Sequence, residues 1–257
     1  PDKHRIAGNS LMDFLPLFHN LKDRNVLVVG GGEVALRKVR LVLQAGAKVT
    51  VVAKDFCPGL VELANEAAST EKTGLNLIAS AYAQAQMESL TTIVLVIAAT
   101  NDRELNHQVS ADAQALNILS NVVDDPDYST VIFPSIVDRS PIQIAISSGG
   151  SAPVLVRRIR TQLEGLIPSG MSRLGALAGS YRDKVKAKFT SGLDRKAFWE
   201  SVFDGPVAEQ AYANNMNEAT RLMENSVNNF STTDIGEIYL VGGGPGDPDL
   251  LTFKAVR

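Results

Sequence analysis

The spacing of apolar residues near the N-terminus predicts a strand, a helix and a second strand in close succession. Residues 26–29 form a short apolar run, and three glycines at 30–32 interrupt it. Residues 33–45 then place apolar side chains at the interval of one buried helix face, and Gly46 provides a C-terminal cap. Residues 48–53 form a second β-rich run, so the whole segment is predicted to be a βαβ unit.

The same alternation of strands and helices continues to about residue 123. The further elements that we expect are helices at 60–68 and 103–116 and strands at 75–79, 92–99 and 118–123. Strands that are separated by helices run parallel and lie in a sheet that helices cover on both faces. The pattern therefore predicts an α/β domain with a Rossmann-like parallel sheet.

Beyond this domain the pattern changes twice. Two β-rich runs, 130–137 and 141–147, are separated by only three residues and predict a hairpin. The chain then becomes mostly helical, with breaks at glycine and proline; the expected helices are 154–167, 172–189, 195–203 and 207–224. The polar residues 225–234 are interpreted as a linker, after which 237–257 open another strand and glycine loop.

Composition excludes several classes of protein. Of the 257 residues, 45% are hydrophobic and 21% are charged, as in an ordinary globular chain. The longest apolar stretch, 93–99, is much shorter than the roughly 20 residues that cross a bilayer, and the N-terminus lacks the apolar core of a signal peptide. The net charge of −3 gives no general reason to bind nucleic acid. We expect a cytoplasmic protein with neither a membrane nor a nucleic-acid partner.

The glycine loop after the first strand is the first candidate site. Gly30-x-Gly32-x-x-Ala35 follows a strand and opens a helix, the context in which backbone N–H groups bind a pyrophosphate. The alternative is a purely structural tight turn. At the end of the second strand, Lys54 could contact a 2′-phosphate and Asp55 a ribose hydroxyl, or both could belong to a solvated loop. We favour NAD over NADP as the ligand.

Polar residues also follow the later strands, at the edge of the sheet where doubly wound folds bind ligands. Thr100 and Asn101 follow the most hydrophobic strand, and Asp124 follows the next one. Asp124 is our candidate general base, with Asp125 and Asp127 close enough in sequence to raise its proton affinity. The alternative is that these acids only solvate a turn.

The histidines and the cysteine offer little chemistry by their positions. None of His4, His19 and His107 falls beside the expected site, so a carboxylate base is the simpler hypothesis. Together with the single cysteine, Cys57, they do not supply the ligand cluster of a preformed metal site.

A second loop and a basic segment suggest a place for an anionic ligand. Residues 147–151 (SSGGS) lead into a helix that carries Arg157, although a plain N-cap explains this loop nearly as well. Residues 157–196 contain ten Lys or Arg and three Asp or Glu, a net charge of +7. This basic segment forms either a solvated helix face or a surface that attracts a small polyanion.

Taken in order, these motifs resemble the dehydrogenase–chelatase half of siroheme synthase, the precorrin-2 dehydrogenase and sirohydrochlorin ferrochelatase family. The motifs are LPLF at 15–18, VVGGGEVALRK at 28–38, AATND at 98–102, NVVDDP at 121–126 and PSIVDRSPIQIAISSGGSAPVL at 134–155. Residues 237–252 are similar to the opening of the S-adenosylmethionine-dependent uroporphyrinogen methyltransferase. Because this similarity stops after one glycine loop, we expect no methyl transfer by this chain, and S-adenosylmethionine only in an intact domain.

The resemblance implies oxidation of precorrin-2 to sirohydrochlorin with NAD, followed by insertion of ferrous iron as a substrate. It implies that Asp124 is the base of both steps and that the protein is a homodimer that exchanges the region 130–147. The other implied contacts are Glu33, Val34, Lys54 and Asp55 with the cofactor, besides Gly30, Gly32, Thr100 and Asn101, and Asn121, Ser147, Ser148, Gly149 and Arg157 with the substrate.

Pattern and resemblance together give a provisional division of the chain. The expected parts are a tag or linker at 1–11, an NAD-binding Rossmann-like domain at 12–133, a dimerisation region at 134–167, a small helical tetrapyrrole-binding domain at 168–232 and the truncated start of a methyltransferase domain at 233–257. Two rival functions stay open: a dehydrogenase of another small acid, and a nucleotide-sensing module without chemistry.

Overall fold

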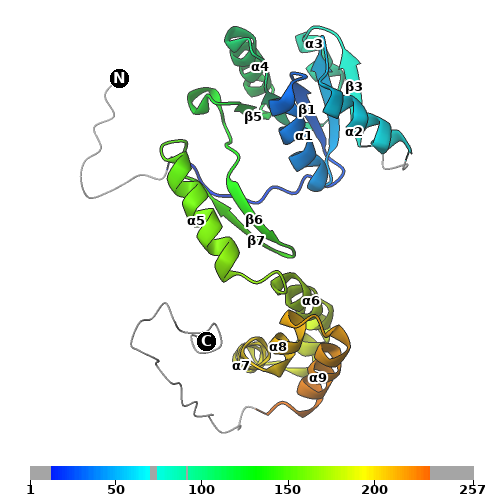
Figure 1. The fold of residues 1–257 in the computed structure, drawn as a ribbon, viewed down its shortest axis with the longest axis vertical. Helices are drawn as coiled ribbons and strands as arrows, with labels where there is room; N and C mark the ends of the chain where they lie inside the picture. Colours follow the sequence, from blue (N-terminus) through cyan, green and yellow to red (C-terminus); the bar gives the residue numbers. More distant parts are fainter. Residues whose placement is uncertain (1–12, 70–73, 91, 232–257) are drawn as a thin grey trace, which may run out of the picture. The chain divides into compact units, whose positions relative to one another are not determined.

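The computed structural model describes residues 13–69, 74–90 and 92–231, and Figure 1 shows its helices and strands. The chain forms two compact units. The sheet unit contains the described residues up to 135 together with 147–156, and the helical unit contains 136–146 and the described residues from 157 onward. The expected linker at 1–11 and methyltransferase start at 233–257 lie outside the described residues.

The sheet unit contains a parallel sheet in the order β3-β2-β1-β4-β5. Its strands are β1 Asn25–Val29, β2 Lys48–Ala53, β3 Leu75–Ala79, β4 Ile93–Ala98 and β5 Leu119–Val122. Its helices are α1 Glu33–Gln44, α2 Pro58–Ser69, α3 Gln84–Ser89 and α4 Arg103–Ala115, with a 3₁₀ turn, η1, at Pro126–Tyr128. The strand order reverses between β1 and β4, which is the position where such sheets bind ligands.

Apolar side chains alternate along the strands and build one core on each face of the sheet. Val26 and Val28 of β1 pack with Val39 of α1 and Leu60 of α2, whereas Leu27 packs on the opposite face against side chains of α3 and α4. Strands buried on both faces read as continuous apolar runs. The predicted α/β class with a Rossmann-like parallel sheet is confirmed, although the sequence pattern missed the short helix α3.

A two-stranded sheet and a long helix follow. The strands are β6 Ser135–Arg139 and β7 Ile142–Ile146, and the helix is α5 Pro153–Leu166. The hairpin is confirmed, but its first strand begins at Ser135 and not at the expected residue 130. Thr130 is instead held beside β5, because its N–H donates to the Ser120 carbonyl at 2.9 Å and its Oγ1 accepts from the Ser120 N–H at 2.7 Å.

The helical unit has its own core. Its helices after α5 are α6 Met171–Lys188, α7 Gly192–Asp204, α8 Pro206–Tyr212 and α9 Met216–Asn229. Phe198 and Met223 are fully buried there. The single helix expected at 207–224 is wrong, because the chain turns at Asn214, which has a φ of 63°. The expected linker from residue 225 is also wrong in its first part, since α9 continues to Asn229.

Several basic side chains of this unit cap helix ends. Arg173 donates to the Ala211 carbonyl at 2.9 Å, at the end of α8, and Lys188 donates to backbone carbonyls at the end of α9. Arg195 donates to the carbonyl of Phe189, directly after α6, at 2.8 Å. Cations stabilise helix C-termini because the last carbonyls there lack intrahelical partners. Part of the basic character of the segment therefore has a structural role.

A buried carboxylate ties α4 to the segment before α3 and gives a test of the fold. Asp112 is 7% exposed and accepts hydrogen bonds from Tyr82 Oη at 2.8 Å and Gln108 Nε2 at 2.7 Å. We expect Tyr82→Phe to lower the free energy of unfolding by about 1–3 kcal/mol, because Asp112 loses a donor that water does not replace. Urea denaturation followed by circular dichroism measures this change.

The matched control is Tyr181→Phe, which removes a hydroxyl that donates to Glu224 at 3.2 Å on an exposed part of the helical unit. We expect this substitution to change the free energy of unfolding by no more than about 0.5 kcal/mol. Equal losses in the Tyr82 and Tyr181 variants would contradict the role given to Tyr82.

The same contact predicts a pH dependence. Burial and the Asp112 carboxylate raise the pKa of Tyr82. The stabilisation from Tyr82 is therefore complete below the ordinary tyrosine pKa near 10 and is lost as the pH rises further.

Candidate cofactor and substrate site

The glycine loop lies against the ends of two neighbouring strands. Gly30 has a φ of +127°, and a Cβ there would lie 2.3 Å from the carbonyl oxygen of Ala99, after β4. A Cβ on Gly31 would lie 1.9 Å from the carbonyl oxygen of Asp55, after β2. Both distances are far below van der Waals contact, so these positions accept only glycine without movement of the backbone.

Gly32 differs from its neighbours because a Cβ there would meet no atom within 4 Å. Gly32 is also the N-cap of α1 and supplies no side chain to the first helical N–H groups. The third position of the motif, Ala35, is fully buried and lets α1 pack closely on the sheet. Open space above a helix N-terminus with uncapped donors fits the phosphates of a dinucleotide.

The predicted cofactor contacts Glu33 and Val34 are the first two residues of α1, and Glu33 is exposed. The segment after β2 runs along the glycine loop, because the Cys57 N–H donates to the Gly31 carbonyl at 2.7 Å. Lys54 and Asp55 are exposed in this segment. The structure therefore brings four of the predicted cofactor contacts to one end of the sheet.

Thr100 has a structural role at the end of β4. Its Oγ1 donates to Asn106 Oδ1 at 2.7 Å, and its N–H donates to the same oxygen at 3.1 Å. Asp102 caps α4 by accepting from the Leu105 N–H at 3.1 Å. The hydroxyl of Thr100 is thus engaged within its own loop, whereas Asn101 is exposed at the same edge.

Asn121, at the end of β5, is 6% exposed and donates through Nδ2 to the Val131 carbonyl at 2.9 Å. Its Oδ1 is buried and has no hydrogen-bond partner. The observed contact fixes the strand to the segment that follows it. The contact between Asn121 and the substrate stays a prediction.

Asp124 lies in the turn after β5 and is exposed, with a φ of 59°. The Asp124 carboxylate interacts electrostatically with the ammonium of Lys38 on α1, whose Nζ lies 4.2 Å from the centroid of the Phe133 ring. Burial lowers the pKa of Lys38, and the Asp124 carboxylate partly opposes that shift. The sequence pattern does not point to Lys38, which lies in the second turn of the helix after the glycine loop.

Asp125, expected to be a repelling neighbour of Asp124, is bound elsewhere. Its Oδ2 lies 2.8 Å from His107 Nε2 and 3.1 Å from Arg103 Nε, both on α4. His107 was taken from the sequence as a residue away from the site, and its contact with the loop of Asp124 is the main feature that sequence reasoning missed. The spacing of Arg103 and His107, four residues apart on one helix face, was the signal available.

The SSGG loop is folded on its own backbone. Ser147 Oγ accepts from the Gly149 N–H and Ser148 Oγ from the Ala152 N–H, each at 3.0 Å. Gly149 and Gly150 both have positive φ, and a Cβ on Gly150 would lie 3.6 Å from the Pro126 ring. This loop therefore lies beside the turn that contains Asp124. The predicted contact Arg157 is exposed on α5.

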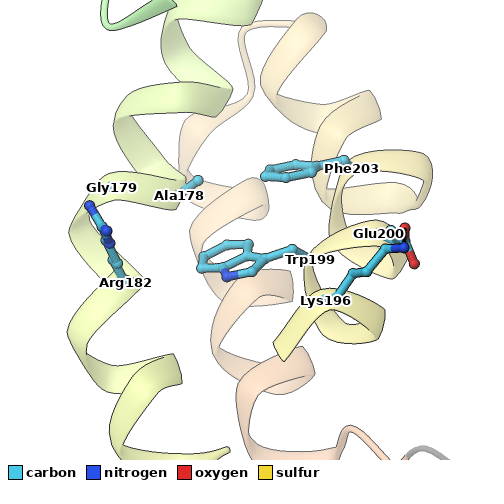
Figure 2. Close-up of a pocket in the computed structure, with 7 residues that line it drawn as sticks. All are labelled: Ala178, Gly179, Arg182, Lys196, Trp199, Glu200 and Phe203. Atoms are coloured by element: carbon cyan, nitrogen blue, oxygen red, sulfur yellow. Dashed lines mark ion pairs between the residues drawn. The ribbon is translucent and has the colours of Figure 1, made fainter. Parts of the chain in front are cut away.

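A separate groove lies within the helical unit. Its volume is about 500 Å³, and Trp199 and Phe203 of α7 face Ala178, Gly179 and Arg182 of α6 across it (Figure 2). The two aromatic rings are stacked, with centroids 5.6 Å apart. The groove is also lined by Lys196 and Glu200, which form an ion pair at 3.6 Å. It therefore offers an apolar surface with charged groups of both signs around it.

Two further observations concern the described part of the chain only. No group of three or more His, Cys, Asp or Glu side chains there is arranged to hold a metal ion. No described helix has the length and apolar character needed to span a membrane.

Comparison with known proteins agrees with this geometry. Residues 17–135 match the family model described as putative NAD(P)-binding, which fits the parallel sheet and glycine loop of an NAD(P)-binding Rossmann-like protein. Residues 139–166 match the model of the sirohaem biosynthesis protein central region, and residues 170–227 that of the sirohaem synthase dimerisation region. The chain therefore matches, in order, an NAD(P)-binding model and two models of sirohaem synthesis proteins.

Individual relatives are similar over nearly the whole chain. The siroheme synthase of Stutzerimonas stutzeri is 50% identical over 246 residues, and that of Pseudomonas putida strain F1 is 52% identical, each match covering 96% of this chain. The chain spans about half of the length of these relatives, 51% of each. The solved structure of SirC, precorrin-2 dehydrogenase, has a TM-score of 0.59 and 23% identity and covers 82% of this chain and 100% of its own. This structure is similar in fold.

Gly31 and Gly32 of the loop give a prediction about cofactor binding. We expect Gly32→Ala to leave the thermal midpoint nearly unchanged but to weaken binding of NADH at least about tenfold, because its methyl group enters the open space above the helix N-terminus. Gly31→Ala serves as the contrast, since its methyl group meets backbone and we expect a clear loss of stability. Differential scanning fluorimetry and NADH fluorescence titration separate these effects. Full NADH affinity in Gly32→Ala would place the phosphates elsewhere.

Proposed function

We propose that the chain oxidises precorrin-2 to sirohydrochlorin with NAD⁺ and then inserts ferrous iron to give siroheme. The observation that carries this proposal is an exposed carboxylate, Asp124, at the same sheet edge as a glycine loop that fits a dinucleotide. The relatives named siroheme synthase supply the substrate class. Because the chain spans about half of their length, the assignment of both reactions to it is an inference.

The two reactions make related demands on one base. In the first, precorrin-2 and NAD⁺ give sirohydrochlorin, NADH and a proton, so a C–H bond breaks with its electron pair and an acidic proton leaves. When bound, the nicotinamide supplies the acceptor of that electron pair. In the second, sirohydrochlorin and Fe²⁺ give siroheme and two protons from the pyrrole nitrogens. We propose that Asp124 accepts protons in both, because an exposed carboxylate can exchange them with water.

The cofactor is proposed to be NAD, bound by Gly30, Gly32, Glu33, Val34, Lys54, Asp55, Thr100 and Asn101. The carboxylate of Asp55 suits the ribose hydroxyls of NAD and would repel a 2′-phosphate. Thr100 would contribute indirectly, since its hydroxyl orders the loop that carries Asn101.

The substrate is proposed to lie beside Asn121, Ser147, Ser148 and Gly149, where the SSGG loop meets the turn of Asp124. The eight carboxylates of precorrin-2 require cationic side chains that bind them. Arg157 is exposed, whereas Arg160 of the same helix is paired with Glu164 at 2.9 Å. We propose that Arg157 binds a substrate carboxylate.

A direct assay tests the proposed function. Anaerobic precorrin-2 with NAD⁺ is expected to give the absorption of sirohydrochlorin together with NADH, and added ferrous iron the absorption of siroheme. Nucleotide binding without turnover would instead support a sensing module, and turnover of another small hydroxy acid a different dehydrogenase.

The role of Asp124 gives a specific prediction. We expect Asp124→Asn to reduce the rate of NADH formation by about 10²–10⁴-fold, because the amide cannot accept the proton. Affinity for NAD⁺ should change no more than a few-fold. Asp127→Asn, in the same loop, is the control and should keep most of the activity. Near-normal rates in Asp124→Asn would show that another group is the base.

We also propose that the chain forms a homodimer through the region 134–167. None of the residues of α5 is buried, and its apolar side chains Val154 and Leu155 are 75% and 56% exposed. An amphipathic helix without a covered apolar face is typical of an interface. The match of residues 170–227 to a dimerisation model supports a dimer but points to the helical unit.

A pair of substitutions separates these two locations. We expect Leu155→Arg to convert the dimer to monomers in size-exclusion chromatography with light scattering, because the charge enters an apolar contact. Leu193, which is 79% exposed on α7, is the matched position in the helical unit. If only Leu193→Arg dissociates the dimer, the contact lies in the helical unit and the assignment to 134–167 fails.

A further inference from the structure

Asp125, which follows the proposed base Asp124, is bound by two side chains of α4. Asp125 Oδ2 lies 2.8 Å from His107 Nε2 and 3.1 Å from the Arg103 Nε, and the Asp125 side chain is only 14% exposed. The hydrogen bond from His107 holds the pKa of Asp125 below its ordinary value. Because an ionised carboxylate only accepts hydrogen bonds, the His107 Nε2 carries the proton of this bond.

The same histidine holds the loop at a second point. Its ring stacks on the ring of Tyr128, with centroids 3.5 Å apart and planes 8° apart. The Tyr128 carbonyl in turn accepts from Ser110 Oγ at 2.6 Å, so α4 contacts the end of η1 as well as its beginning. Both ends of the short segment 125–128 are therefore fixed to one helix.

This attachment has a consequence for Asp124. Its φ of 59° lies in the left-handed region, which non-glycine residues adopt infrequently. On one side of Asp124 lies β5, whose Val122 carbonyl accepts from the Asp125 N–H at 3.2 Å. On the other side, the Asp125 carbonyl accepts from Ser129 Oγ at 2.9 Å, and the Asp125 side chain supplies the contact with His107. Loss of the side-chain contact would therefore loosen the turn.

We propose that His107 is a positioning residue, which acts through its hydrogen bond to Asp125 to hold the carboxylate of Asp124 in place for proton transfer. The inference rests on the proposed function, because it assigns Asp124 the role of base. Arg103 is the weaker partner: its side chain is 76% exposed, and an ion pair so open to water contributes little. His107 is 23% exposed and makes both the hydrogen bond and the ring contact.

Two substitutions at this position separate the two contacts. His107→Phe keeps a ring against Tyr128 but loses the hydrogen bond, and His107→Gln keeps an N–H donor but loses the ring. We expect His107→Phe to lower kcat for NADH formation about tenfold or more, since small displacements of a catalytic group are costly, with affinity for NAD⁺ unchanged. His107→Gln should keep most of kcat.

A second measurement follows the turn itself. Hydrogen–deuterium exchange of a peptide spanning 121–130 is expected to be faster in His107→Phe and close to wild type in His107→Gln. Glu104→Gln, at an exposed position on the same helix, is the matched control and should change neither quantity. Thermal midpoints of all variants establish that the fold is intact.

The outcomes are distinguishable. A wild-type kcat in His107→Phe, with or without faster exchange, overturns the positioning role, and so does an equal loss of kcat in both variants. A wild-type chain that does not oxidise precorrin-2 overturns the proposed function first, and the role of His107 in that reaction falls with it. Loss in His107→Phe with rescue in His107→Gln supports the proposal.

Discussion

The site depends on how closely three stretches of backbone approach one another at the point where the strand order reverses. The loop after β1 lies so near the ends of β4 and β2 that no side chain fits at Gly30 or Gly31. This approach sets the start of α1, whose uncapped N–H groups then face open space. The open N-terminus of α1 and the packing of Ala35 on the sheet are thus parts of one geometry.

The loops that carry the proposed site residues are ordered mostly by their own polar groups. Thr100 and Asn106 bond within one loop, Ser147 and Ser148 within another, and Asp125 binds α4. Loops fixed in this way keep their shape without burial in a core, so their exposed groups stay accessible. Asp124 remains one of those exposed groups because its neighbours are engaged elsewhere.

Much of the sheet unit could be predicted because apolar residues repeat along each strand and each helix at the spacing typical of that element. The apolar runs of β1, β2, β3, β4 and β5 were found within a few residues. The helical unit was harder: weak signals such as the break at Asn214 decide where a helix ends, and the sequence 207–224 reads as continuous. Within the site, Gly30, Gly32 and Asp124 were identifiable by their place after strands, whereas Lys38 and His107 were not.

The sequence by itself determined the parallel sheet, the glycine loop and the carboxylate at the strand edge, because local periodicity and the chemistry of glycine act over few residues. Only the tertiary structure decided which charges meet. His107 and Asp125 are 18 residues apart and make a 2.8 Å contact because α4 and the loop after β5 fold together. Such contacts depend on the direction of side chains in space, which spacing along the chain does not specify.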